Sequence, residues 1–120
     1  MTIQVFGTKK CAETRKAERF FRERRIPFHS VDLAQKGLSK GELQSVAARV
    51  GGMGVLADTG SKRWIDRGLK YLTPSGPRLE GLLLEDPLLL RTPIVRSGRD
   101  ATVGYQPDVW TGWIAVVKGT

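Results

Sequence analysis

Apolar and polar positions at the start of the chain predict a strand, a helix and a second strand. Residues 2–6 have the pattern of a buried strand, and residues 12–25 have the spacing of an amphipathic helix. Ile26-Pro27-Phe28 ends that helix, and residues 28–32 return as a strand. A helix between two strands predicts a parallel βαβ unit with a right-handed crossover.

The middle of the chain predicts a series of short helices. Ser39 and Glu42 have the spacing of a capping box, and Gly51-Gly52 ends the helix that they begin. Further short helices are expected over residues 53–57, 62–69 and 79–84, the second of them ending at Gly68, with turn-rich breaks at 58–61 and 73–77. We therefore expect a helical insertion over approximately residues 38–86.

From Thr92 onward the pattern returns to strands. Residues 93–96 and 101–104 predict an antiparallel hairpin around a tight turn at 97–100, and residues 107–116 predict a terminal helix. The complete order is βαβ, a helical middle and then ββα. It predicts an α/β fold with a thioredoxin-like mixed β-sheet and an inserted helical subdomain, in one domain over residues 1–120.

The charge of the chain changes this picture little. The net charge is +8 over 120 residues, but Lys and Arg alternate with Glu and Asp along the expected helices. That arrangement is typical of solvated faces, although an anionic partner or substrate stays open. Aromatic residues do not alternate with basic ones, so direct nucleic-acid binding is not expected. No apolar run approaches the roughly 18–20 residues of a membrane span. We expect a monomer.

Cys11 is the strongest candidate for chemistry. It follows the first strand and a short turn, and it begins the first helix. Free backbone N–H groups and the helix dipole favour an anion there, and Lys9, Lys10 and Arg15 add positive charge nearby. This setting predicts a thiol with a lowered pKa that acts as a nucleophile. The alternative is an inert, buried cysteine.

A single cysteine also limits the other possibilities. It excludes an internal disulfide and is consistent with the reducing cytosol. His29 is the only histidine and lies on an expected strand, so no metal site is predicted. No bound cofactor is expected either.

Several short motifs resemble the ArsC/Spx family, which contains glutaredoxin-dependent arsenate reductases and Spx-type transcription regulators. The motifs are the segment from Phe6 to Cys11, the Cys-x-x-x-Arg spacing to Arg15, Asp86-Pro87, the segment from Arg91 to Val95, and Val103-Gly104-Tyr105. The resemblance covers nearly the whole chain and implies a thioredoxin-like fold.

The resemblance also implies site residues. Cys11 and Arg15 would be catalytic, and Lys10, Arg91, Thr92 and Pro93 would bind an oxyanion or substrate. In thioredoxin-like folds the proline at this strand start is cis and lies beside the active cysteine, so we expect a cis Thr92–Pro93 bond.

The sequence departs from the family at the arginines that hold the oxyanion. The family usually has arginines in the middle loop, just before the proline and near the start of the last helix. Here those places hold Asp58-Thr59, Thr92 and Gln106, while Lys62 and Arg63 follow the middle loop at a short distance. Thr14 stands where redox-switch members of the Spx branch often have a second cysteine.

Two functions remain open at this point. The first is an arsenate reductase-like oxidoreductase in which glutathione regenerates Cys11 and glutaredoxin clears the mixed disulfide. The second is an Spx-like regulator or adaptor that binds RNA polymerase without catalysis.

Overall fold

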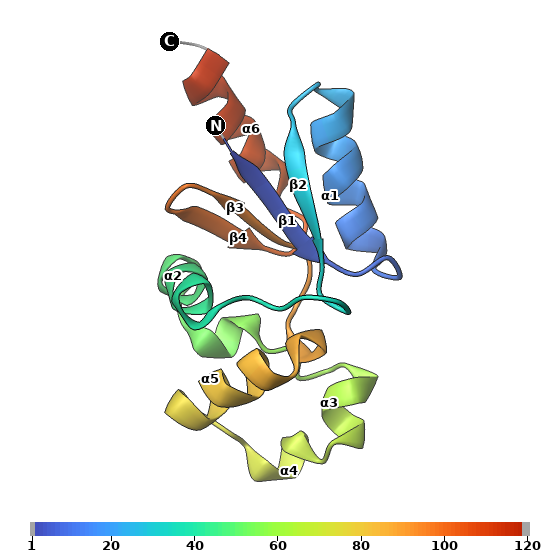
Figure 1. Cartoon of the computed structure of the whole chain (residues 1–120), viewed down its shortest axis with the longest axis vertical. Coiled ribbons are helices and arrows are strands. Elements are labelled where there is room, and N and C mark those ends of the chain that lie inside the picture. Colours follow the sequence, from blue (N-terminus) through green and yellow to red (C-terminus); the bar gives the residue numbers. More distant parts are fainter. Residues whose placement is uncertain (1, 119–120) are drawn as a thin grey trace.

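The fold is built on one mixed β-sheet. The computed structural model describes residues 2–118. The sheet has four strands in the order β2-β1-β3-β4, with β1 parallel to β2 and antiparallel to β3, and with β3 antiparallel to β4 (Figure 1). The strands and the two helices that accompany them are β1 (Ile3–Gly7), α1 (Ala12–Glu23), β2 (Phe28–Asp32), β3 (Ile94–Ser97), β4 (Asp100–Val103) and α6 (Pro107–Lys118). This confirms the predicted thioredoxin-like sheet.

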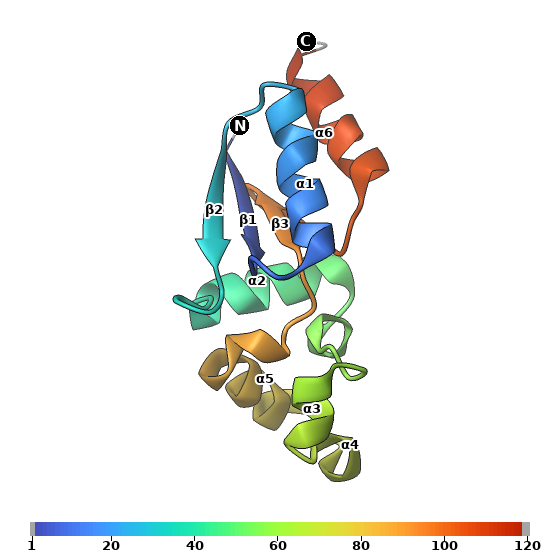
Figure 2. The same ribbon diagram turned by 90° about the vertical axis from the view of Figure 1, so that its right-hand side faces the viewer.

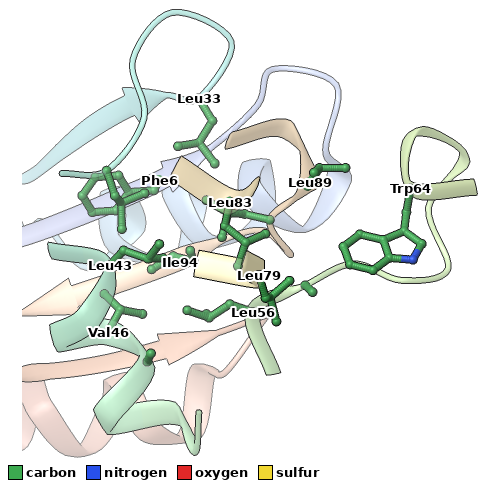
Figure 3. Packing of buried hydrophobic residues seen from close by; sticks show 14 of the residues in the cluster. Phe6, Leu33, Leu43, Val46, Leu56, Trp64, Leu79, Leu83, Leu89 and Ile94 are labelled. Carbon is green, nitrogen blue, oxygen red and sulfur yellow. The ribbon is translucent and has the colours of Figure 1, made fainter. Parts of the chain in front are cut away.

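The two faces of the sheet bury two separate hydrophobic clusters. Because side chains alternate along a strand, Ile3 and Val5 of β1 point to one face and Phe6 points to the other. Helices α1 and α6 cover the first face, as Figure 2 shows, and there Phe21 and Trp110 are fully buried. Phe6 instead belongs to the larger cluster that joins the sheet to the helical middle of the chain (Figure 3).

Helix α1 ends two residues earlier than its apolar spacing predicted. Arg24 is the C-cap, and Arg25 adopts a φ of 57°. The backbone N–H of Ile26 then donates to the carbonyl oxygen of Phe21 at 2.9 Å. This closed turn reverses the chain ahead of β2.

The helical middle begins with the predicted capping box. Ser39 Oγ accepts a hydrogen bond from the Glu42 backbone N–H, the Glu42 side chain accepts one from the Ser39 N–H, and Gly51 ends the helix with a φ of 108°. Gly51 is favoured there because a side chain would strain that conformation. The elements that follow β2 are α2 (Lys40–Val50), η1 (Met53–Leu56), α3 (Lys62–Asp66), α4 (Leu69–Leu72), α5 (Gly76–Glu85) and η2 (Pro87–Leu89), where η denotes a 3₁₀ helix.

Two predictions in this region were wrong in detail. The helix expected over 62–69, ending at Gly68, is α3 and already ends at Asp66. Gly68 adopts the left-handed conformation at a φ of 71°, and the helix α4 that follows it was not expected. The expected break at 73–77 is shorter, because α5 already begins at Gly76 with Pro77 in its first turn. Proline fits there because the first helical N–H groups have no partner within the helix.

A buried carboxylate connects the small helices. Asp86 lies between α5 and η2 and is 8% exposed. Arg63 Nε donates to both of its oxygens at 2.9 and 2.8 Å, and Arg67 Nη1 donates to Oδ2 at 2.9 Å. Burial raises the pKa of Asp86, but the hydrogen bonds from Arg63 and Arg67 outweigh it, so the pKa is lowered overall.

Within residues 2–118, none of the helices has the length and apolar character that a membrane crossing requires.

We predict that Asp86→Asn lowers the free energy of unfolding by about 1–3 kcal/mol at pH 7, because the charged acceptor of both arginines is lost. A carboxyl group whose pKa is lowered by folding stabilises the protein above its unfolded pKa of about 3.9, and this stabilisation disappears as the pH falls. The difference between wild type and variant in urea denaturation should therefore shrink below pH 4. The control is Asp66→Asn, because Asp66 forms only an exposed pair with Lys62. Equal losses in the two variants would contradict the proposed role of Asp86.

Candidate functional site

Cys11 lies where β1 passes into α1. It is the N-cap of α1 and is partly exposed. Its backbone N–H donates to the Thr8 carbonyl oxygen at 3.2 Å, and its own carbonyl oxygen accepts from the Arg15 N–H at 3.2 Å. The side chain makes no capping bond to the helix. The first N–H groups of α1 are therefore available to a negative charge on the sulfur.

Thr92 forms a direct hydrogen bond with the sulfur. Its Oγ1 donates to Cys11 Sγ at 3.1 Å, and its carbonyl oxygen lies 3.9 Å from the same sulfur. The Thr92–Pro93 peptide bond is cis, as expected. Because β1 and β3 pair antiparallel, with Phe6 opposite Ile94, the start of β3 lies beside the end of β1. The sheet thus brings together two residues that are far apart in the sequence.

The pKa of the Cys11 thiol is lowered, as predicted, but its main causes differ from the expected ones. Partial burial raises the pKa, and this effect is outweighed by the hydroxyls of Thr14 and Thr92 and by the backbone N–H groups of Thr14 and Glu13. The helix-start part of the sequence argument therefore holds. Two neutral hydroxyls are the side chains that lower the pKa most, rather than the lysines and the arginine of the turn.

Thr14 is the residue that the sequence interpretation missed. It is 5% exposed, and its hydroxyl has no regular hydrogen-bond partner among residues 2–118. It is nevertheless close enough to the sulfur to lower the thiol pKa. A Cβ at Gly7 would overlap the Thr14 side chain, so the glycine allows this close packing. Thr14 is one helical turn from Cys11, and that spacing was the signal available in the sequence.

Three of the expected anion-binding residues remain candidates. Arg15 Nη1 donates to the Lys9 carbonyl oxygen at 2.6 Å, so its guanidinium lies along the turn that precedes Cys11. The side chains of Lys10 and Arg91 are exposed and make no hydrogen bond or ion pair with any residue from 2 to 118. The roles of these three residues stay predictions.

The two cations after the middle loop are engaged elsewhere. Arg63 donates to Asp86, and Lys62 Nζ pairs with Asp66 Oδ2 at 2.7 Å. Each has a carboxylate partner in its own helical region, so neither is free to replace a family arginine without breaking an ion pair. In the part of the chain that the structure describes, no group of three or more His, Cys, Asp or Glu side chains is placed to hold a metal ion.

The fold is thioredoxin-like, with a single, partly exposed cysteine at the start of α1. The comparison with family models specifies it further. The model described as "ArsC family" matches residues 6–112, and the chain belongs to this family.

The similar proteins and solved structures carry different functional names. The chain is 29% identical over 136 residues to the global transcriptional regulator Spx 2 of Oceanobacillus iheyensis, covering 99% of this chain and 100% of that protein. It is 26% identical over 112 residues to the uncharacterized protein YusI of Bacillus subtilis, covering 90% and 94%. An arsenate reductase from Vibrio cholerae superposes with a TM-score of 0.80 at 18% identity, covering 93% of this chain and 97% of that one. At that identity the superposition shows a shared fold.

We predict that Thr92→Val raises the thiol pKa and slows alkylation of Cys11 at pH 7 roughly two- to tenfold, the effect of losing one hydrogen bond of about 0.5–1.5 kcal/mol. The measurement is the iodoacetamide rate as a function of pH. Thr92→Ser should restore the wild-type profile because it keeps the hydroxyl. Thr2→Val is the matched control, since Thr2 precedes the opposite end of β1. An unchanged profile in Thr92→Val would refute the assignment.

Proposed function

We propose that this protein is a thiol-dependent oxidoreductase in which Cys11 is the reactive group and glutathione is the co-substrate. The observation that carries this proposal is the hydrogen bond of 3.1 Å from Thr92 Oγ1 to Cys11 Sγ, made at the start of a helix. The donors around the sulfur favour the thiolate, which is the nucleophilic form. Membership of the ArsC family supports a cysteine-based reaction at this position.

Thiol exchange requires of the site itself only a reactive thiolate. The Cys11 thiolate attacks one sulfur of a disulfide, a new S–S bond forms, and the electron pair of the broken bond leaves on the other sulfur as a thiolate. A glutathione thiolate then attacks the mixed disulfide and releases Cys11. Because the chain has no second cysteine, the reductant has to come from outside, and glutaredoxin is the class of protein that clears glutathione mixed disulfides.

Arsenate reduction requires further groups around the sulfur. The Cys11 thiolate would attack arsenic with loss of water, glutathione would supply the second thiol, and cations would have to stabilise the oxyanion. Arg15 and Arg91 are the candidates for that role, while Arg63 is bound to Asp86. Each missing charge-assisted contact removes roughly 1.5–3 kcal/mol. We therefore propose disulfide exchange as the main reaction and arsenate reduction as a weak one.

The alternative is a regulator of the Spx type that contacts RNA polymerase. The observation in its favour is the relative named as a global transcriptional regulator, which aligns over 99% of this chain. A pull-down with RNA polymerase tests this alternative directly. It also predicts that a Cys11→Ser variant keeps its activity in the cell.

We predict that the wild-type protein reduces hydroxyethyl disulfide with glutathione, and that Cys11→Ser abolishes the reaction. The measurement is NADPH consumption coupled through glutathione reductase. With arsenate as the substrate and glutaredoxin added, turnover should lie roughly two to four orders of magnitude below that of an ArsC enzyme with all its arginines, at about 1.4 kcal/mol per tenfold and two lost contacts.

Two outcomes would count against this prediction. Equal activity in wild type and Cys11→Ser would remove the enzyme proposal and leave the adaptor. Arsenate turnover as fast as that of a complete ArsC site would show that other cations replace the missing arginines.

A further inference from the structure

An apolar hollow lies on the surface of the helical middle of the chain. It has a volume of about 530 Å³ and is formed by η1, α3, α4, the start of α5 and the loops between them. Figure 3 shows two of its lining residues, Trp64 and Leu79, in the buried cluster behind it, with the Trp64 indole turned toward Leu79. The residues that matter for the argument are Trp64, Ile65, Leu69, Lys70, Pro74 and Leu79.

The surface beside this hollow exposes large apolar side chains. Ile65 is 52% exposed at its edge, and the neighbouring α4 exposes Tyr71 at 85% and Leu72 at 52%. Scattered exposed apolar residues are common on proteins, but a group of them around an apolar hollow is typical of an interaction site.

The charges around the hollow are mainly positive. Between residues 59 and 79 the sequence has five cations and one acidic residue, Asp66. Asp86 pairs with Arg63 and Arg67 from outside this segment. Lys70 is the one charged residue that lines the hollow, and it makes no hydrogen bond or ion pair with any residue from 2 to 118. The exposed Arg78 likewise has none within the described residues. An acidic partner would complement both charges.

The loop that lines one side of the hollow is hydrogen-bonded to the segment that leads to Thr92 at the cysteine site. Ala57, which lines the hollow, forms an antiparallel β-bridge with Leu90. The Arg91 N–H donates to the Leu56 carbonyl oxygen at 2.8 Å, and Thr92 on the sulfur follows directly. Figures 1 and 2 both place α3 on the same side of the molecule as the start of α1, with the loop after η1 between them.

We propose that this hollow is the docking site for an acidic, apolar segment of a protein whose own cysteine exchanges with Cys11. The hollow would receive an apolar side chain near the reacting sulfur of that protein, and its acidic residues would pair with Lys70 and Arg78. This inference rests on the proposed function, because the reacting partner is a thiol or disulfide of a protein. It adds the class of partner and the surface that selects it.

The test uses synthetic cysteine peptides carrying thionitrobenzoate as a mixed disulfide. Cys11 forms the new S–S bond to the peptide sulfur, and thionitrobenzoate leaves with the electron pair, which gives an optical signal. Three peptides are compared: acidic with an apolar side chain, the same with Lys in place of the acidic residues, and the acidic peptide with Ser in place of the apolar residue. We expect the first to react about tenfold faster than either of the others, because one buried apolar side chain and its charge pairs contribute at least that factor.

The double variant Ile65→Ser, Lys70→Glu should lose this tenfold preference, while its rate with hydroxyethyl disulfide stays unchanged. The matched control is Val109→Ser, Lys40→Glu, which makes comparable changes at exposed positions of α6 and α2 that do not line the hollow. Equal rates for the three peptides, or loss of preference in the control, would overturn the docking site. A concentration-dependent dimer that the first double variant abolishes would overturn it too, by assigning the hollow to a second copy of the chain.

A separate measurement distinguishes failure of the docking site from failure of the proposed function. The acidic apolar peptide with Ser in place of its cysteine is titrated into the protein, and the Trp64 indole N–H signal is followed by NMR. If Cys11 proves unreactive toward hydroxyethyl disulfide but this signal moves and the double variant suppresses it, the surface stands and the thiol partner is refuted. If Cys11 reacts but the signal does not move, the docking site alone is refuted.

Discussion

The antiparallel pairing of β1 with β3 is the constraint on which the site depends. It places Phe6 opposite Ile94, so the chain leaving β1 toward Cys11 passes the chain that enters β3 from Thr92. The segment between β2 and β3 has to return to this point after six short helices. The β-bridge between Ala57 and Leu90 and the Arg91 N–H bond to Leu56 fix its return. The hydroxyl of Thr92 reaches the sulfur because both ends are held by backbone hydrogen bonds.

Local signals in the sequence predicted most of the elements. The capping box at Ser39 and the glycine stop at Gly51 act within a few residues, so they can be recognised without knowing the fold. The stop near Gly68 was expected as well, but the helix already ends at Asp66. The four-residue helix α4 beyond Gly68 was not expected, because so short a helix leaves no periodic pattern in the sequence. The cis Thr92–Pro93 bond was expected from the family resemblance alone.

The partners of the charged groups could not be predicted in the same way. The sequence shows twenty cations and twelve acidic residues but not which of them meet. The sequence made Arg63 a candidate for the site, but its guanidinium donates hydrogen bonds to Asp86, which is 23 residues away in the sequence. Arg15 follows Cys11 by about one helical turn, and its guanidinium contacts the Lys9 carbonyl oxygen. The net charge of the chain therefore says little about the electrostatic potential at one sulfur, because the fold determines which carboxylate or carbonyl each long cationic side chain contacts.

Thr92, the residue before the proline, determines which charges near the sulfur can be stabilised by hydrogen bonds. A guanidinium at that position would carry a full charge and present several donors in a planar fork, which fits an oxyanion bound beyond the sulfur. The threonine found here has one short, neutral donor, and that donor is already on Cys11 Sγ at 3.1 Å. The hydroxyl of the buried Thr14 likewise lowers the pKa of the thiol. A thiolate held this way is more populated at neutral pH and is a better leaving group, and disulfide exchange uses the same sulfur first as the attacking thiolate and then as the leaving group.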